Sequence, residues 1–223
     1  MNILFVGKPG SGKGTITQNL LDDGFLQLST GDLLRKEAKT GSDLAAEINE
    51  RLAQGKFASD ETIFKVVEKF LKENEGKSII FDGFPRNVEQ ARHCLEKGLV
   101  FDHIFEIDVS DDLVKERIVN RRIHQPSGRV YNIKTMPPKV EGVDDVTGEP
   151  LTHRHDDKLE VLDHRLADYK NLTAPVIDFL KTNGFSVIRV DGSTELDSQL
   201  SQVKSSLNDN LTDNAHHTKR NKP

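Results

Sequence analysis

Short apolar runs alternate along the chain with longer segments in which apolar residues recur every three or four positions. The short runs predict strands at residues 2–6, 25–28, 78–81, 103–109 and 186–190. The clearest helical stripe places apolar side chains on one face of a helix: Ile63, Val66, Val67, Phe70 and Leu71. A later helical pattern contains Pro175, which predicts a kink or break there. The alternation indicates an α/β fold with a parallel sheet buried between helices.

Two longer stretches interrupt this alternation. Residues 30–59 hold short helical segments separated by glycines, which predicts a small helical lobe. Residues 121–157 contain the turn sequences PSGRVY and DVTGE, which favour a small folded β lobe over disorder. The polar residues 204–223 are predicted to form a disordered tail. The remaining residues, 1–29, 60–120 and 158–203, are expected to form the core domain.

Composition and charge exclude several classes of protein. The 31 basic residues against 36 acidic ones, a net charge of −5, argue against a general binder of nucleic acid or of anionic membranes. The chain begins with a strand-like segment instead of a signal peptide, and no run approaches the roughly 20 apolar residues of a membrane span. The single cysteine, Cys94, lies in a helical pattern and is expected in the core. These features predict a cytoplasmic protein.

A glycine-rich segment, GKPGSGKGT at residues 7–15, directly follows the first predicted strand and precedes a helical pattern. It has the Walker A order, except that Gly14 stands before the hydroxyl residue. In such a loop, backbone N–H groups and the helix dipole bind phosphate oxygens, and a lysine, here Lys13, adds a mobile charge. Thr15 can hold Mg²⁺ or a phosphate oxygen. The loop predicts a nucleotide-phosphate site, but by itself it leaves kinase, GTPase and ATPase open.

Further blocks accompany this loop: STGDLLR at 29–35, DGFPR at 82–86, RRIHQPSGRVY at 121–131 and HRHDD at 153–157. Together they resemble the adenylate kinase family in its long-lid form, from residue 1 to about residue 195. The resemblance implies a P-loop three-layer α/β fold with a central parallel five-stranded sheet, a helical AMP-binding lobe at 30–59 and a β lid lobe at 121–157. It implies a monomer, with ATP, AMP and ADP as its small-molecule partners.

The activity implied by the resemblance is reversible transfer of the terminal phosphoryl group from MgATP to AMP, which gives two ADP. A GTP:AMP phosphotransferase stays open because its lid and AMP site would look alike. A P-loop switch that binds one nucleotide without turnover is the alternative outside the enzymes. A UMP/CMP kinase is disfavoured because its lid is short, whereas the inserted stretch here is long.

Transfer between two nucleotides brings two polyanions together, and the planar, permanently charged fork of arginine suits that task. By resemblance the catalytic residues are Lys13, Asp82, Arg86, Arg121, Arg154 and Arg165, with Asp82 orienting the hydrated Mg²⁺. The ATP site is expected to comprise Gly10, Ser11, Gly12, Lys13, Gly14, Thr15, Arg117, Arg121, Val130, Tyr131 and Thr194. The AMP site is expected to comprise Thr30, Arg35, Lys56, Phe57, Ala58, Gly83, Arg86, Gln90, Arg154 and Arg165. Because the acceptor oxygen is already anionic, no strong general base is required.

The expected lid contains the positions at which some family members hold zinc with cysteines. They are here His124, Ser127, Asp144 and Thr147. Serine and threonine are poor zinc ligands, so a hydrogen-bonded polar quartet is expected in place of zinc. Asp156 and Asp157 are expected to hold the closed lid or its hinge. Lys8 replaces the small residue expected in the phosphate loop, and it either adds a phosphate contact or points outward.

Overall fold

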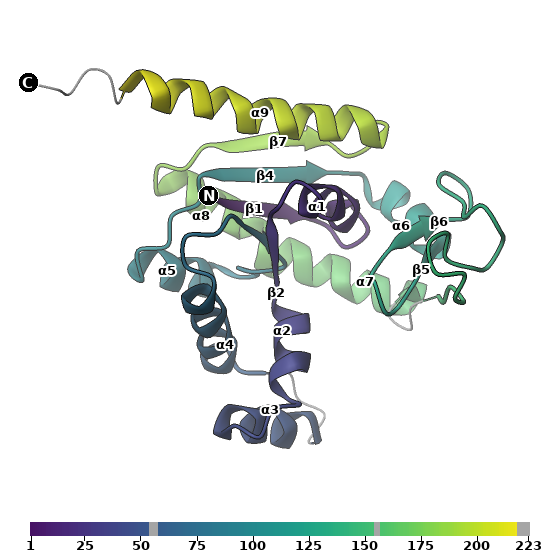
Figure 1. The fold of residues 1–223 in the computed structure, drawn as a ribbon, viewed down its shortest axis with the longest axis horizontal. Helices are drawn as coiled ribbons and strands as arrows, with labels where there is room; N and C mark the ends of the chain where they lie inside the picture. The colour runs from purple at the N-terminus through teal and green to yellow at the C-terminus, as the bar shows by residue number, and fades with distance from the viewer. Residues whose placement is uncertain (54–57, 154–156, 218–223) are drawn as a thin grey trace, which may run out of the picture.

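A parallel five-stranded sheet forms the centre of the computed structural model, which describes residues 1–53, 58–153 and 157–217. The strands are β1 (Asn2–Gly7), β2 (Leu26–Ser29), β3 (Ile79–Asp82), β4 (His103–Asp108) and β7 (Val187–Asp191). They lie side by side in the order β2-β3-β1-β4-β7 (Figure 1). Each begins and ends within one residue of its predicted bounds. The predicted α/β fold with a parallel five-stranded sheet is therefore confirmed.

Helices cover both faces of this sheet and make the fold three-layered. The helices of the central domain are α1 (Lys13–Leu21), α4 (Asp60–Glu73), α5 (Val88–Glu96), α6 (Asp111–Val119), α7 (Leu159–Asp168), α8 (Ala174–Thr182) and α9 (Leu196–His217). Helices α1 and α9 pack on one face, and α4, α5 and α8 pack on the other. A π-helical turn, Tyr169–Thr173, separates α7 from α8 directly before Pro175, where the sequence predicts a kink or break.

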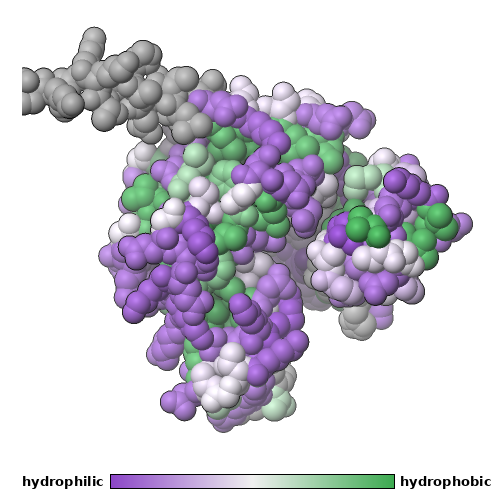
Figure 2. Space-filling model, viewed as in Figure 1, coloured by the Kyte–Doolittle hydropathy of each residue, from purple (hydrophilic) through white to green (hydrophobic). Residues whose placement is uncertain are grey.

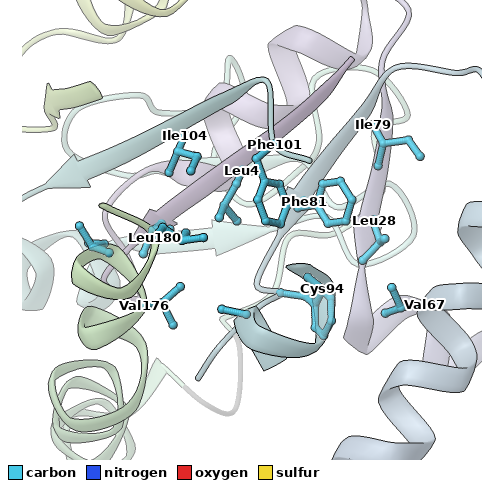
Figure 3. Close-up of a cluster of buried hydrophobic side chains, with 14 residues drawn as sticks. Leu4, Leu28, Val67, Ile79, Phe81, Cys94, Phe101, Ile104, Val176 and Leu180 are labelled. Carbon is cyan, nitrogen blue, oxygen red and sulfur yellow. The ribbon is translucent and has the colours of Figure 1, made fainter. Parts of the chain in front are cut away.

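Alternation of side chains along the strands builds the two cores. Ile3 and Phe5 face the cluster that α1 and α9 complete, whereas Leu4 and Val6 face the cluster beneath α4, α5 and α8. Figure 3 shows the second cluster, in which Cys94 lies among apolar side chains. Cys94 is buried in the core, as the sequence predicts, and this burial raises the pKa of its thiol to about 12.

Capping side chains fix where several of the helices begin. Ser59, Asn87 and Ser110 each accept a hydrogen bond from the backbone N–H three residues later, at the first turns of α4, α5 and α6. Such bonds satisfy N–H groups that have no partner within the helix. The start of α5 matters for the site because α5 follows the DGFPR segment directly.

Two smaller lobes project from the central domain (Figure 1). Helices α2 (Thr30–Glu37) and α3 (Asp43–Ala53) lie beyond the end of β2. The antiparallel pair β5 (Arg121–Ile123) and β6 (Val130–Asn132) forms the other lobe, with further pairing between Ile123 and Thr152. Helix α6 ends at Val119, and Arg121 already belongs to β5.

The prediction of a disordered tail from residue 204 is wrong in its starting point. Helix α9 continues to His217, and Val203 and Leu207 are buried in the cluster with α1. Their apolar contacts stabilise a helix whose polar sequence suggested disorder, because burial of one face outweighs composition. Residues 218–223 lie outside the described residues. Within the part of the chain that is described, no helix combines the length and apolar character needed to span a membrane.

Candidate active site

The glycine-rich loop lies between β1 and α1 at the carboxyl edge of the sheet, where open α/β sheets bind their ligands. Gly10 and Gly12 have φ angles of 76° and 105°, in the left-handed region that glycine adopts without strain. Gly12 directly precedes the first residue of α1. The loop therefore directs its backbone and the positive end of the α1 dipole toward one point, which is the arrangement that binds phosphate.

Lys13 is held in the loop by carbonyl groups of the loop itself. Its Nζ donates to the oxygen of Gly7 at 2.5 Å, to that of Lys8 at 2.9 Å and to Ser11 Oγ at 3.3 Å. Burial lowers the pKa of Lys13 to about 8. The charge of Asp82 opposes this change, whereas three guanidinium groups add to it: Arg86, Arg165 and Arg121. Since such effects require proximity, the fold gathers four of the predicted cationic residues and Asp82 around one point.

Asp82 is the last residue of β3, and its Oδ2 accepts a hydrogen bond of 2.8 Å from Gln27 on β2. Gly83 follows with a φ of 76°, and its carbonyl accepts a hydrogen bond of 2.7 Å from Arg86 Nε. A Cβ on Gly83 would lie 3.0 Å from the guanidinium of Arg86. The positive φ therefore favours glycine at the turn, and a Cβ here would also press on the guanidinium of Arg86.

Gln90 is buried and its amide group makes contacts within the protein. Its Oε1 accepts from the backbone N–H of Arg86 at 2.7 Å, and its Nε2 donates to Asp60 Oδ1 at 2.7 Å. Thr173 adds a hydrogen bond to the carbonyl of Arg86. The Gln90 amide therefore supports the backbone at Arg86, a role that the motif spacing does not predict.

The other residues expected at the AMP site are more dispersed. Thr30 is buried at the start of α2, and Ala58 is half-buried just before α4. The Arg35 side chain is 71% exposed and forms an ion pair with Asp32 one turn earlier on α2. No contact places it beside Arg86 within the described residues. Lys56, Phe57 and Arg154 lie outside the residues that the structure describes.

On the donor side, Arg117 joins the phosphate loop to the turn after β7. Its guanidinium donates to the carbonyl of Ser11 at 3.2 Å and to that of Gly192 at 2.7 Å. Burial lowers the pKa of Arg117. The buried amide of Gln199 donates to the carbonyl of Thr194 at 2.6 Å, which fixes the same turn. Arg117, Thr194 and the loop, all expected at the ATP site, are therefore neighbours.

Arg121 and Arg165 meet at the carboxylate of Asp157. The Asp157 side chain is fully buried and accepts two hydrogen bonds from Arg121, while Arg165 Nη1 lies 4.0 Å away. This bidentate pair orients Arg121 at the base of the β5–β6 lobe. Asp157 thus lies at the junction of the lobe with α7, and its role as a hinge or lid contact stays a prediction. Asp156 lies outside the described residues.

The four polar side chains expected to replace a zinc site lie together in the β5–β6 lobe. His124 Nδ1 is 2.7 Å from Ser127 Oγ, and Thr147 Oγ1 donates to Asp144 Oδ2 at 2.9 Å and lies 3.4 Å from His124 Nε2. The four are hydrogen-bonded as predicted. Among the described residues, no group of three or more His, Cys, Asp and Glu side chains is placed to hold a metal ion.

Three further side chains complete this polar cluster. Arg129 binds Asp144 through two hydrogen bonds of 2.8 and 2.7 Å, and the buried Tyr131 hydroxyl donates to the same carboxylate at 2.9 Å. Glu149 lies 2.6 Å from His124 Nε2. The hydrogen bonds, that of Arg129 foremost, hold the pKa of Asp144 well below its usual range. The Tyr131 side chain is therefore buried in the lobe and bonded to Asp144, so Tyr131 can contact a nucleotide only through its backbone.

Sequence reasoning missed the supporting residues of the site: Gln27, Asp60, Arg129, Glu149 and Gln199. Arg129 and Glu149 lie beside the quoted lobe motifs, so an uncompensated buried Asp144 could have suggested a cationic partner. The others are polar residues in ordinary strand or helix positions. No local signal marks Gln27 or Asp60, because their partners, Asp82 and Gln90, lie 55 and 30 residues away in the sequence. Gln199 bonds to the nearby carbonyls of Gly192 and Thr194, a contact that depends on how the turn after β7 folds.

The hollow between the central domain and the β5–β6 lobe is visible in Figure 2. A P-loop at the edge of the parallel sheet carries a lysine surrounded by arginines and one aspartate. This fold and site define the class of P-loop nucleotide-binding proteins that handle phosphoryl groups. A family model described as adenylate kinase matches residues 5–185. The chain is 39% identical over 212 residues to an adenylate kinase of Photorhabdus laumondii subsp. laumondii, covering 91% of this chain and 99% of that protein. The chain belongs to the adenylate kinase family and is a nucleoside monophosphate kinase.

Proposed function

We propose that this enzyme transfers the terminal phosphoryl group of MgATP to AMP, with the donor on the phosphate loop and the acceptor beside Arg86. The observation that carries this assignment is the gathering of three arginines and one aspartate around Lys13: Arg86, Arg121, Arg165 and Asp82. Several cations at one point are costly in the free protein because they repel each other. They become favourable when the phosphates of two nucleotides enter between them.

The donor phosphates bind the loop N–H groups of residues 10–15 and the ammonium of Lys13. The contacts of Arg117 with Ser11 and Gly192 support a donor base lying beside this arginine, near the backbone of Thr194 and of Val130 and Tyr131. Arg121 and Arg165, joined by Asp157, extend toward the phosphoryl group during transfer. Their fixed positive charges stabilise the charge that develops on the transferred group.

The acceptor lies on the opposite side, against Arg86 and the helical lobe. Gly83 permits the position of Arg86, and the hydrogen bonds of Gln90 and Thr173 hold the backbone of Arg86. Arg35, Thr30 and the segment at Lys56, Phe57 and Ala58 complete the proposed AMP site, together with Arg154. To recognise the AMP base, the Gln90 amide must release its hydrogen bond to Asp60 and form one with the base instead.

The residues at the edge of the sheet fit a magnesium ion carried by ATP. Asp82 offers a carboxylate beside Lys13, and Thr15 offers a hydroxyl at the start of α1, and hard oxygen donors of this kind suit Mg²⁺. Asp82 would hold the hydrated ion, which neutralises phosphate charge when bound. Gln27 keeps the Asp82 carboxylate in place.

The lobe at 121–157 is proposed to act as the lid, closing over the phosphates so that water cannot accept the phosphoryl group. The buried polar cluster around Asp144 gives this small lobe a rigid interior without zinc. We further propose that the enzyme works as a monomer in the cytoplasm, with no nucleic acid or membrane partner.

A coupled assay of ADP formation from MgATP and AMP tests the proposal, with GTP as the competing donor. We expect turnover by the wild type and a fall in kcat of at least about 100-fold in Arg86→Ala, because a cation that stabilises the transition state is removed. Arg92→Ala is the matched control, since Arg92 lies on α5 against Phe179 and Glu89 and should leave kcat unchanged.

A bisubstrate mimic, two adenosines joined by five phosphates, provides the second measurement. It should bind with one molecule per chain and compete with both nucleotides. Normal turnover by Arg86→Ala would contradict the acceptor-site assignment. Failure of the mimic to bind would instead reduce the site to a pocket for one nucleotide.

A further inference from the structure

Lys8 lies within the phosphate loop, yet its side chain reaches across to another element. Its Nζ donates to the carbonyl of Val109 at 2.8 Å and forms an ion pair with Asp111 Oδ1 at 2.5 Å. Val109 directly follows β4, and Asp111 is the first residue of α6. The side chain is 24% exposed. The sequence leaves two options open for Lys8, a contact with phosphate or a side chain that points outward. The structure shows neither, because the ammonium is bonded to Val109 and Asp111.

A cavity lies beside Lys8. This cavity of about 560 Å³ is lined by Lys8 and Asp111 and continues along β4 and α7 to Tyr169 and Lys170. In the part of the chain that the structure describes, Lys13, Asp82 and the arginines around them do not line it. The Lys8 ammonium therefore faces a different space from the one that the proposed phosphates enter.

The backbone of Lys8 supports the functional lysine. Its carbonyl accepts the hydrogen bond of 2.9 Å from Lys13 Nζ and also one of 3.1 Å from the N–H of Ser11. Gly7, one residue earlier, is fixed by pairing of β1 with β4, and a Cβ there would lie only 2.7 Å from the carbonyl of Ile107. Lys8 thus continues the contact between β1 and β4 beyond the edge of the sheet.

Helix α6, to which the Lys8 side chain binds through Asp111, also contributes residues to the proposed donor site. Helix α6 carries Arg117, which binds the carbonyl of Ser11, and one residue after its C-cap comes Arg121. The loop is therefore attached to α6 at two points, by Lys8 at the first turn and by Arg117 at the last. Two attachments fix the orientation of the loop, whereas one would leave it free to tilt.

We propose that Lys8 is a positioning residue for the donor nucleotide. Its side chain fastens the phosphate loop to the end of β4 and to Asp111, and so keeps the Lys8 carbonyl and the Lys13 ammonium in place. This inference rests on the proposed donor site. It predicts that removal of either partner weakens binding of MgATP and leaves the acceptor site unaffected.

The test measures the Kd of MgATP by calorimetry and the KM values of both substrates for three variants. We expect Lys8→Met to raise the Kd and KM of MgATP about three- to fivefold, the scale of one half-exposed ion pair. Asp111→Asn should raise them in the same direction. The double variant should be no worse than Lys8→Met, because both changes remove one interaction. The KM of AMP should stay within about twofold.

The sign of the change in the Kd of MgATP in Asp111→Asn distinguishes a positioning role of Lys8 from a direct attraction between Lys8 and the phosphates. If Lys8 acted only as a positive charge near the phosphates, removal of the negative Asp111 would strengthen the local positive potential and tighten MgATP binding. Lys115→Met is the matched control, because Lys115, like Lys8, pairs with an aspartate, here Asp163 at 3.0 Å, but lies on α6 and outside the phosphate loop. It removes the same charge without touching the loop, and the Kd of MgATP should not change.

Lys8→Arg keeps both the charge and the ability to bind Asp111, so it should restore a Kd near that of the wild type. Tighter MgATP binding by Asp111→Asn, or an unchanged Kd in Lys8→Met, would overturn the proposal. An equal rise in the KM of AMP would do the same, because it would indicate a general loss of structure. A wild type that binds MgATP but forms no ADP would refute the proposed function instead, and the Kd values would still test Lys8.

Discussion

Lys13 is predicted to destabilise the free protein while it makes phosphate binding possible. Burial and the neighbouring arginines lower its pKa from 10.5 to about 8, which corresponds to about 3 kcal/mol by which the folded state disfavours the charged ammonium. Methionine has a similar length and no charge. We therefore expect Lys13→Met to raise the stability of the nucleotide-free protein at pH 7 by about 1–3 kcal/mol, less the value of the lost hydrogen bonds.

The measurement is thermal unfolding of wild type and Lys13→Met between pH 7 and pH 10. At about 2–4 °C per kcal/mol for a chain of this length, Lys13→Met should gain roughly 2–12 °C in Tm at pH 7. The cost of the ammonium is fully present below a pH of about 8, the pKa in the folded state, and disappears as the pH rises toward 10.5. The difference in Tm between the two proteins should therefore shrink over that interval. Titration with MgATP should show a loss of affinity of about two orders of magnitude.

Lys115→Met serves as the control because the pKa of Lys115 is raised by its hydrogen bond to Asp163. Its removal should lower stability slightly, the opposite sign to Lys13→Met. The reasoning would be refuted by a Lys13→Met variant that unfolds at a lower temperature than the wild type at pH 7. In that case the bonds from Lys13 to the carbonyls of Gly7 and Lys8 would outweigh the cost of burying the charge.

Three further predictions concern other parts of the site and core. Asp157→Asn removes the buried charge that binds Arg121, and urea unfolding should show a loss of about 3 kcal/mol; an unchanged midpoint would contradict a buried ion pair. Gly83→Ala forces a Cβ into a left-handed conformation and against the guanidinium of Arg86, so it should cost about 1–3 kcal/mol and lower ADP formation. Wild-type activity there would be evidence against the placement of Arg86. The Cys94 thiol, with a pKa raised to about 12, should react with thiol reagents only in urea, and rapid labelling of the native protein would exclude burial.

The sequence predicted the sheet and the phosphate loop because both depend on local patterns. Short continuous apolar runs are typical of strands that are buried on both faces. They predicted strands at residues 2–6 and 78–81, where the structure has Asn2–Gly7 and Ile79–Asp82. The left-handed angles of Gly10 and Gly12 are conformations that glycine adopts on its own. The family motifs predicted catalytic roles for Asp82, Arg86 and Arg121, and the structure brings the charges of all three close to Lys13.

Tertiary structure alone decided which polar groups support the site. Gln90 binds Asp60, 30 residues away, and Lys8 binds Asp111, 103 residues away. Tertiary packing also decided the extent of α9. Its polar sequence predicted disorder from residue 204, but Leu207 is buried against the core and stabilises the helix. Hydrophobic periodicity carries no information about partners this distant, since a hydrogen bond or an apolar contact depends on how separate elements pack. The chain by itself therefore fixed the elements and the reacting groups, and packing of those elements fixed the contacts that hold the reacting groups in place.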